Sequence, residues 1–323
     1  MGDLTFVDVC SGAGGLALGL EQAGFEPRLL LDEDELAVTT LRTNRPLWNV
    51  LHTDLLDFDP AEHPVSYDVD LLAAGLPRVR SSPTAQRVDT GSEERLLEAA
   101  VYLVHAIRPR AVVIENVPEL VHSDVHQHFR DFAQAELDHL GYTIHWLVMN
   151  AVDFGVPQSR KHGVLVAVRH EWAELFRPPI PTAQGPVTVG AALGPSMAAR
   201  GWPDAARWAA QADQPAPTLV GGSKNRGGAD LGPSRAKEKW ATMGVNAHTV
   251  GDEVPGPDFV WDPELGRDHM VKLTVEQAAL VQSFPATWQI SGLKTARYRQ
   301  IGHATPPPVG KALGLAVAEA LKQ

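Results

Sequence analysis

Strand-like and helix-like segments alternate along the first half of the chain. Continuous apolar runs such as LTFVDV (residues 4–9) and AVVIEN (111–116) are typical of strands that are buried on both faces. Segments with helical periodicity lie between them, and the clearest is SEERLLEAAVYLVHAI (92–107), with Ser92 as its expected N-cap. The alternation predicts a mostly parallel sheet with helices on both faces, so the fold class is α/β.

The second half of the chain differs in composition and predicts a second, smaller domain. The segment FRPPIPTAQGP (176–186) is typical of a linker, and the residues after it are rich in Gly, Pro and Trp. Helical periodicity returns only towards the C-terminus. We therefore expect a large domain of residues 1–178, a small domain of 179–271, and a C-terminal segment, 272–323, that completes the large domain.

Charge is distributed unevenly. Residues 1–160 contain 11 Lys and Arg against 25 Asp and Glu, whereas residues 161–323 contain 17 against 14. The overall net charge of −11 argues against a nucleic-acid partner, because phosphate binding depends on Lys and Arg. Residues 221–240, however, contain five basic against two acidic side chains, as expected either of a surface that faces phosphates or of a solvated charge run.

Cysteine and histidine content limits the chemistry that the chain can carry. A single cysteine excludes an internal disulfide framework and a zinc site built on cysteines. His122, His126 and His128 fit exposed helix positions better than a metal site, so no metal is predicted. No apolar run approaches the roughly 18 residues that span a bilayer, and no leader is recognised. We expect a cytoplasmic protein that does not interact with membranes.

Glycines and carboxylates follow the first three predicted strands. Gly12, Gly14 and Gly15 stand where the first strand turns into a helix, which lets the backbone approach a ligand closely. Asp32 ends the second strand, where a carboxylate can bind the hydroxyls of a ribose. Asp54 ends the third strand and can accept a hydrogen bond from an adenine amino group. The pattern predicts a nucleoside-containing ligand.

Several motifs in a fixed order resemble those of the DNA cytosine-5 methyltransferases, and the resemblance covers nearly the whole chain. The motifs are DVCSGAGG, LDEDELAVTTLRTNRP, HTDLLDF, IENVPEL, VPQSRKH, LTVEQAALVQSFP and YRQIGHATPPPVGKALG. The resemblance implies a Rossmann-like, S-adenosylmethionine-dependent methyltransferase fold with a small target-recognition domain. The cofactor-binding residues that it implies are Cys10, Gly12, Ala13, Gly14, Gly15, Asp32, Glu33, Asp54, Leu55, Gly75 and His303.

Four positions depart from the family pattern outside the catalytic loop. Cys10 stands where the family usually has a phenylalanine, and Asp32 where it usually has a glutamate. His162 replaces the last arginine of the Gln-x-Arg-x-Arg motif, and His303 replaces the usual asparagine of the last motif.

The loop AGLPRVRSSPTAQR (74–87) lacks the catalytic group of the family. Alignment through AGLP places Arg78 at the position of the nucleophilic cysteine, Val79 at a glutamine and Ser81 at a phenylalanine. In the family a cysteine thiolate adds to carbon 6 of cytosine, which activates carbon 5 for methylation. An arginine cannot replace a thiolate, and losing a covalent nucleophile typically lowers the rate roughly 10³- to 10⁶-fold. Methylation at carbon 5 is therefore expected to be weak or absent.

Other nucleophiles are poor substitutes. Ser81, Ser82 and Thr84 show no partner base, and an unactivated hydroxyl is far weaker than a thiolate. Cys10, the only thiol, lies in the cofactor motif and is expected to be a small buried residue. Because several positions of Ala74–Arg87 have changed together, natural divergence explains the loop better than a point mutation.

The remaining catalytic positions implied by the resemblance are Glu115, Asn116 and Arg160. Glu115 is expected to contact N3 of a flipped cytosine, or else to be a strand-end carboxylate satisfied by Arg160 or by backbone. Arg78 and Arg80 either hold phosphates and fill the space left by a flipped base, or are solvated loop cations. The candidate DNA-binding residues are Arg80, Lys224, Arg226, Arg235, Lys237 and Lys239.

Three functions remain open from the sequence. The first is a protein that binds S-adenosylmethionine and double-stranded DNA without methylating carbon 5. It would act as a regulator or as a partner of an active methyltransferase or restriction component, and would lie on the nucleoid when bound to DNA. The second is a methyltransferase with a different acceptor atom. The third is ordinary carbon-5 methylation through an unrecognised nucleophile.

Overall fold

The computed structural model describes residues 4–79, 91–221 and 228–322. They divide into two compact units: unit 1 takes the described residues up to Met149 together with 161–180 and those from Val309 on, and unit 2 takes 150–160 and the described residues of 181–308.

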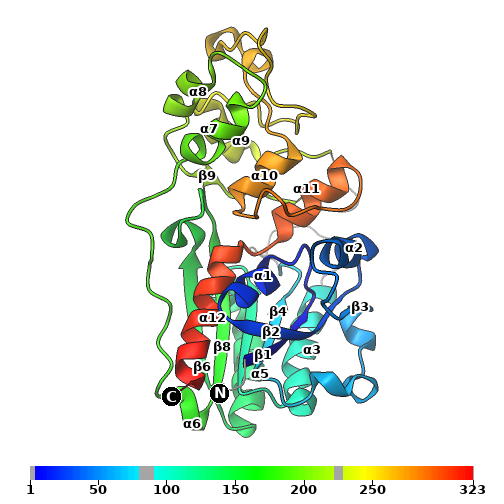
Figure 1. The fold of residues 1–323 in the computed structure, drawn as a ribbon. Helices are drawn as coiled ribbons and strands as arrows, with labels where there is room; N and C mark the ends of the chain where they lie inside the picture. The colour runs from blue at the N-terminus through cyan, green and yellow to red at the C-terminus, as the bar shows by residue number, and fades with distance from the viewer. Residues whose placement is uncertain (1–3, 80–90, 222–227, 323) are drawn as a thin grey trace. The chain divides into compact units, whose positions relative to one another are not determined.

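Unit 1 contains a seven-stranded sheet in the order β3-β2-β1-β4-β5-β8-β6 (Figure 1). The pairs from β3 to β5 are parallel, and β8 is antiparallel to β5. This mixed, mostly parallel sheet confirms the predicted α/β class. The strands are β1 (Leu4–Val9), β2 (Phe25–Asp32), β3 (Val50–His52), β4 (Leu71–Gly75), β5 (Ala111–Asn116), β6 (Tyr142–Asn150) and β8 (Lys161–Arg169).

Helices cover both faces of this sheet. On one face α3 and α5 pack together over a continuous apolar core that includes Val7, Leu72 and Ile114. On the other face α12 approaches α1 so closely that a Cβ at Gly310 would lie 2.9 Å from the backbone oxygen of Leu16. The helices are α1 (Gly15–Gln22), α2 (Glu35–Asn44), α3 (Ser92–Ile107), α4 (Glu119–His122), α5 (Gln127–His139), α6 (His170–Ala173) and α12 (Pro307–Leu321).

The start of α3 differs from the prediction. Gly91 is the N-cap of α3, and Ser92 is the first residue inside the helix. The prediction of Ser92 as N-cap is therefore wrong by one residue, since the helical backbone already includes it and its first turn is acidic through Glu93 and Glu94.

Unit 2 is built from short helices around buried tryptophans. Trp208 on α8 and Trp240 on α9 are fully buried, and α7 packs against both α8 and α10. The elements are β7 (Gln158–Ser159), β9 (Ala216–Pro217), α7 (Val189–Ala198), α8 (Ala205–Gln211), α9 (Ser234–Thr242), α10 (Val275–Val281) and α11 (Lys294–His303).

The two units bear on the predicted domain boundaries. The first boundary, predicted after residue 178, lies near the division at residue 180. Residues 272–308, which we expected to return to the large domain, group instead with unit 2, because α10 packs on α7 and Gln277 bonds to Ser196 at 3.2 Å. The functional assignment of each domain stays a prediction. No described helix is long and apolar enough to cross a membrane.

Candidate cofactor and base site

The carboxyl ends of β1, β2, β4 and β5 lie at one edge of the sheet, because these strands are parallel neighbours. In such folds ligands bind outside this edge, where the strand order changes direction. The predicted site residues of unit 1 follow these four strands. The topology therefore brings together residues that are up to about a hundred positions apart in the sequence.

The turn after β1 has an open, strained backbone. Cys10 and Gly12 both adopt left-handed conformations, with φ of 56° and 53°. The Ser11 N–H donates to the Leu31 carbonyl at 3.0 Å, which holds the turn against β2. A Cβ added at Gly12 would meet no atom within 4 Å, so open space lies beside this backbone. The turn leads into α1 through Ala13, which is buried, and through Gly14 and Gly15.

Asp32 is fastened to that turn. Its two carboxyl oxygens accept hydrogen bonds from the backbone N–H groups of Gly12 at 2.7 Å and Asp34 at 2.8 Å. Burial raises the pKa of Asp32, and these two bonds oppose the shift. A carboxylate has about four acceptor positions, so Asp32 can also accept from the hydroxyl groups of a ligand.

Asp54, Leu55 and Glu33 lie near the ends of β3 and β2. Asp54 caps the short 3₁₀ helix Leu55–Asp57 by accepting from the Leu56 N–H at 2.9 Å. Leu55 is buried, whereas Glu33 is exposed and its carbonyl bonds to the His52 ring at 3.0 Å. The sequence placed these residues correctly at strand ends; their contacts with a cofactor stay a prediction.

Asp8 and Cys10 occupy an acidic environment beneath the turn. Asp8 is fully buried, and neither of its carboxyl oxygens has a hydrogen-bond partner among the described residues. Burial raises the pKa of Asp8 to about 8. Burial, followed by the charges of Asp32, Asp8, Glu33 and Asp54, raises the pKa of the Cys10 thiol well above its usual value. Cys10 is therefore protonated at neutral pH.

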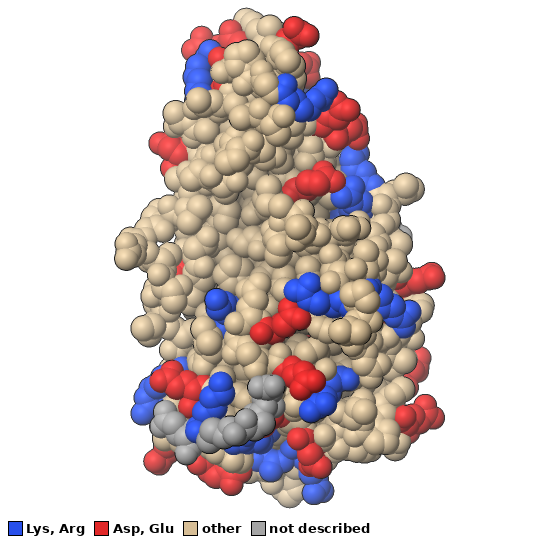
Figure 2. Space-filling model, in the orientation of Figure 1, with Lys and Arg blue, Asp and Glu red and all other residues tan. Residues whose placement is uncertain are grey.

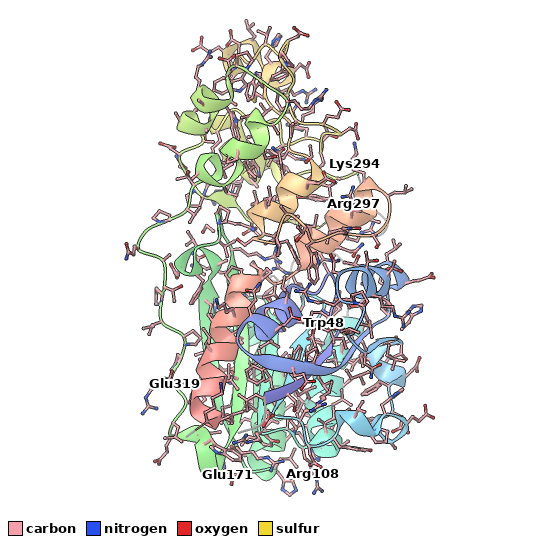
Figure 3. The ribbon with its side chains drawn as sticks, in the orientation of Figure 1. Trp48, Arg108, Glu171, Lys294, Arg297 and Glu319 are labelled. Carbon is pink, nitrogen blue, oxygen red and sulfur yellow. The ribbon has the colours of Figure 1, made fainter. Side chains whose placement is uncertain are left out.

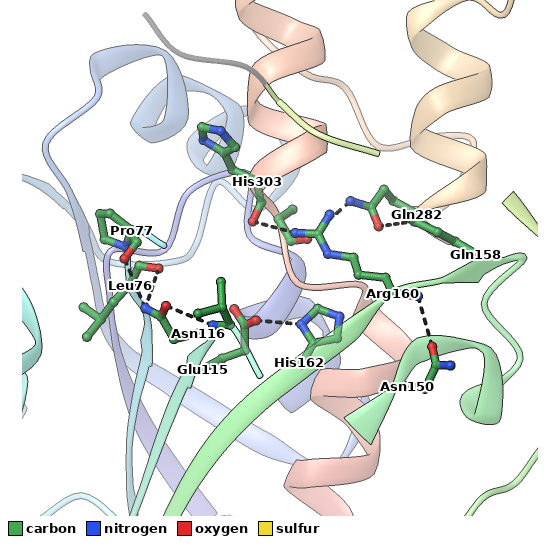
Figure 4. Close-up of polar contacts among 12 residues, drawn as sticks. Leu76, Pro77, Glu115, Asn116, Asn150, Gln158, Arg160, His162, Gln282 and His303 are labelled. Carbon is green, nitrogen blue, oxygen red and sulfur yellow. Dashed lines mark hydrogen bonds and ion pairs between the residues drawn. The ribbon is translucent and has the colours of Figure 1, made fainter. Parts of the chain in front are cut away.

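Asn116 holds the segment that follows β4. Its side-chain oxygen accepts from the Val79 N–H at 3.0 Å, and its amide nitrogen donates to the Pro77 carbonyl at 3.1 Å (Figure 4). Arg78, between these two anchored residues, is half-buried, and its Nη2 atom is buried without a hydrogen-bond partner among the described residues. The backbone at the predicted nucleophile position is thus fixed, beside Gly75 and the end of β5.

Glu115 and His162 form a buried pair across β5 and β8. The His162 Nδ1 atom lies 2.6 Å from Glu115 Oε1, and the side chains are only 0% and 5% exposed (Figure 4). Gly163 allows β8 to approach this closely, because a Cβ there would lie 2.2 Å from the Val117 carbonyl oxygen. The sequence prediction named Arg160 as the side chain that could satisfy Glu115, and it missed His162 in that role.

Arg160 belongs to unit 2, where it ties backbone segments together. Its guanidinium donates to the carbonyls of Leu219 at 3.2 Å, Gly302 at 2.8 Å and His303 at 3.5 Å. Gln158 bonds to the Leu219 N–H and to Gln282 in the same network. Arg160 therefore has a structural role that its motif did not reveal.

His303 ends α11, and its side chain is exposed. A Cβ at Gly221 would lie 2.5 Å from His303 Cδ2, so the imidazole lies directly against the Gly221 backbone. The structure thus places His303 beside the start of the basic segment, and its predicted cofactor contact stays a prediction.

The candidate DNA-binding residues are only partly described. Arg235 and Lys239 are exposed on α9, while Lys237 is paired with Asp230 at 2.9 Å. Arg80, Lys224 and Arg226 lie outside the described residues.

Other basic side chains of unit 2 are paired too. Lys294 bonds to Asp252 and Arg297 to Glu276, both on α11 (Figure 3). Figure 2 shows Lys and Arg interspersed with Asp and Glu on the face drawn. Within the described ranges no group of three or more potential ligands could hold a metal ion.

Two functional candidates escaped the sequence analysis. Asp8 read as an interior strand position, and the signal that could have found it was a carboxylate inside an otherwise apolar run. His162 was recorded only as a departure from an arginine. Its signal was that a titratable group replaces a fixed charge in the motif that follows Glu115 in the chain.

Comparison with known proteins agrees with this geometry. The profile of the C-5 cytosine-specific DNA methylase family matches residues 4–194 and 215–319. The chain is 43% identical to the type II methyltransferase M.NaeI of Lentzea aerocolonigenes, over 99% of this chain and 76% of that protein. It is 36% identical to M.NgoMIV of Neisseria gonorrhoeae, over 99% and 98% of the two chains.

The fold is shared more widely than the sequence. The structure of the methyltransferase EhMeth of Entamoeba histolytica superposes with a TM-score of 0.66 over 100% of both chains, at 14% identity. S-adenosylmethionine is the methyl donor of the family and the fold, and is therefore the cofactor of this chain. The chain belongs to the family of C-5 cytosine-specific DNA methylases.

Proposed function

We propose that this family member binds S-adenosylmethionine and double-stranded DNA, and that Arg78 in place of the nucleophile leaves its methylation of cytosine carbon 5 weak or absent. The observation that carries the proposal is the anchoring of Arg78. Asn116 bonds to the residues on either side of it, so the segment keeps a fixed backbone but presents a guanidinium. A guanidinium is protonated at every working pH and cannot add to carbon 6.

The only thiol of the chain does not compensate for this loss. Cys10 lies in the turn after β1, and the surrounding carboxylates and burial raise its pKa. A thiol must lose its proton to act as a nucleophile, and this environment opposes that loss.

The turn after β1 fits S-adenosylmethionine. The open space beside Gly12 can admit the ligand, Asp32 can accept from the ribose hydroxyls, and Asp54 can accept from the adenine amino group. Asp8, buried without a partner among the described residues, supplies a carboxyl group suited to a cofactor that carries positive charge. When bound, the cofactor supplies an electrophilic methyl group.

DNA binding is proposed through the basic segment of the small domain and the loop after β4. Arg235 and Lys239 are exposed on α9 and can contact phosphates. Arg78 can hold a phosphate, or occupy the space that a flipped base leaves in the duplex. A protein with these properties would act as a regulator or as the partner of an active methyltransferase or restriction component.

A second candidate function is methyl transfer to a different acceptor atom or through an unrecognised nucleophile. Two observations favour it: the bonds from Asp32 to the turn are intact, and the relatives M.NaeI and M.NgoMIV are named as methyltransferases. An exocyclic amine, for example, can be methylated without attack on carbon 6.

Methyl transfer from labelled S-adenosylmethionine into mixed-sequence duplex DNA separates these functions. We expect no label from the natural chain and label from Arg78→Cys. Arg78→Ser is the matched control, since it removes the guanidinium without adding a thiol, and it should remain inactive. Label at carbon 5 from the natural chain would overturn the proposal, and label at any other atom would establish the second function. Calorimetric titration with S-adenosylmethionine tests the cofactor site independently of activity.

A further inference from the structure

We infer that His162 is a positioning residue that makes the choice of base by Glu115 depend on pH. The inference rests on the proposed function, because it assumes that Glu115 meets the edge of a base displaced from DNA. It concerns this chain in particular, since the family resemblance places an arginine, whose charge is fixed, where His162 stands.

The geometry makes the two side chains a single unit. Glu115 Oε1 and His162 Nδ1 are 2.6 Å apart, and both groups are almost completely buried. The antiparallel pairing of β5 and β8 places Asn116 opposite Gly163 and Glu115 opposite Val164. Groups that interact this strongly titrate as a pair rather than separately.

The number of protons on the pair decides which atoms it can bind. With one added proton, His162 can donate to Oε1 while the second carboxyl oxygen carries a hydrogen, so the pair donates to an acceptor such as N3 of cytosine. Without that proton the carboxylate can only accept, as from the N3–H of thymine. Binding cytosine therefore takes up one proton from solvent, whereas binding thymine takes up none.

Other charged groups lie on the elements that pack around the pair. They are Arg78 after β4, Glu119 and His122 on α4, and His145 on β6, together with Arg160, Lys161 and Arg169 in or next to β8 in the chain. Burial lowers the pKa of His145, so it is neutral near pH 7. Arginine and lysine keep their charges over the range of interest. Glu119 is ionised throughout this range, so a titration of His122 or of the Glu115–His162 pair must be separated by variants.

The experiment uses two duplexes that differ only in one unpaired base, cytosine or thymine, because an unpaired base is displaced at little cost. Fluorescence anisotropy gives the two affinities from about pH 6 to about pH 8. We expect the ratio of cytosine to thymine affinity to fall as pH rises, by up to about tenfold per pH unit within the titration range. The ratio cancels any general effect of pH on binding to phosphates.

Three variants identify the group responsible. In His162→Arg the fixed charge should make the ratio independent of pH and favour thymine. In Glu115→Gln, which preserves shape, the ratio should also become independent of pH. His122→Gln is the matched control and should keep the slope. If His162→Arg does not fold, Glu115→Gln decides the question.

The outcomes separate the inference from the proposed function. A constant ratio in the natural chain, or a slope that survives in a folded His162→Arg or in Glu115→Gln, would overturn the inference and leave DNA binding intact. Loss of the slope in His122→Gln would assign it to the wrong histidine and also overturn the inference. Absence of binding to either duplex would overturn the proposed function, and the inference with it.

Discussion

The side-chain oxygen of Asn116 accepts a hydrogen bond from the backbone N–H of Val79 at 3.0 Å, across the ends of β5 and β4. The same side chain donates to the Pro77 carbonyl and is fully buried. One amide thus holds the position at which the family carries its nucleophile. The anchoring of this segment has survived a change in the residue that it presents.

Replacing this amide should destabilise unit 1. Asn116→Ala leaves a buried N–H and a buried carbonyl without their partner, which typically costs about 1–3 kcal/mol. Urea unfolding measures the loss. Gln127→Ala is the control, because its bond to Asp131 is exposed and should contribute little. Equal stability of Asn116→Ala and the natural chain would show that the segment is held by other contacts.

Asp32→Asn should weaken cofactor binding. The asparagine has one acceptor oxygen and turns an N–H group towards the backbone N–H of Gly12 or Asp34, both of which now donate to the carboxylate. We expect S-adenosylmethionine to bind at least about tenfold more weakly, the equivalent of one charge-assisted hydrogen bond. Calorimetry measures the affinity, and Asp59→Asn, at the cap of another short helix, is the control. An unchanged affinity would remove Asp32 from the cofactor site.

The raised pKa of Asp8 predicts a pH dependence in each state of the protein. Its pKa of about 8 in the folded chain lies above the ordinary value near 3.8. Between these values the folded state holds a proton that the unfolded state has lost. The contribution of Asp8 to stability therefore falls as pH rises through this window and levels off above about pH 8.

Cofactor binding should reverse that effect. A cationic ligand beside Asp8 favours its ionised form, so binding should release a proton and tighten as pH approaches 8. Calorimetry in buffers of different ionisation enthalpy measures the released proton directly. Asp8→Asn should release none and lose the pH dependence. Equal proton release by both proteins would show that another group is titrating.

The sequence was a good guide to the sheet and a poor guide to side-chain pairing. Continuous apolar strands and helical periodicity identified the main elements of unit 1, because burial on two faces leaves a strong pattern; AVVIEN corresponds to β5 residue for residue. The helix expected over 273–284 shortened to Val275–Val281, since Gln282 and Ser283 leave the helical conformation and only tertiary packing decides such ends.

The candidate site shows the same division. Gly12, Asp32 and Glu115 could be placed because each follows a strand and parallel strands end at one edge. The partner of Glu115 could not be placed, because β8 enters the sheet antiparallel to β5 and its register is a property of the folded chain. Arg160 and His162 are two residues apart, and the sequence does not say which of them meets the carboxylate.

Gly163→Ala tests whether that register is rigid. A Cβ at Gly163 would lie 2.2 Å from the Val117 carbonyl oxygen and 2.9 Å from its carbon, so the backbone of β8 or of the turn after β5 must move. Such overpacking typically costs about 1–3 kcal/mol, and the movement should also separate His162 from Glu115. Thermal unfolding measures the first effect, and the pH dependence of the cytosine to thymine ratio reports the second.

Gly194→Ala is a control of opposite sign. Gly194 lies inside α7, and an added Cβ would make an ordinary contact of 3.5 Å with Ala209 Cβ. Alanine is favoured over glycine within a helix by roughly 1 kcal/mol, so this variant should be as stable as the natural chain or more so. If Gly163→Ala behaved in the same way, the close approach of β8 to Val117 would not be what fixes His162 against Glu115.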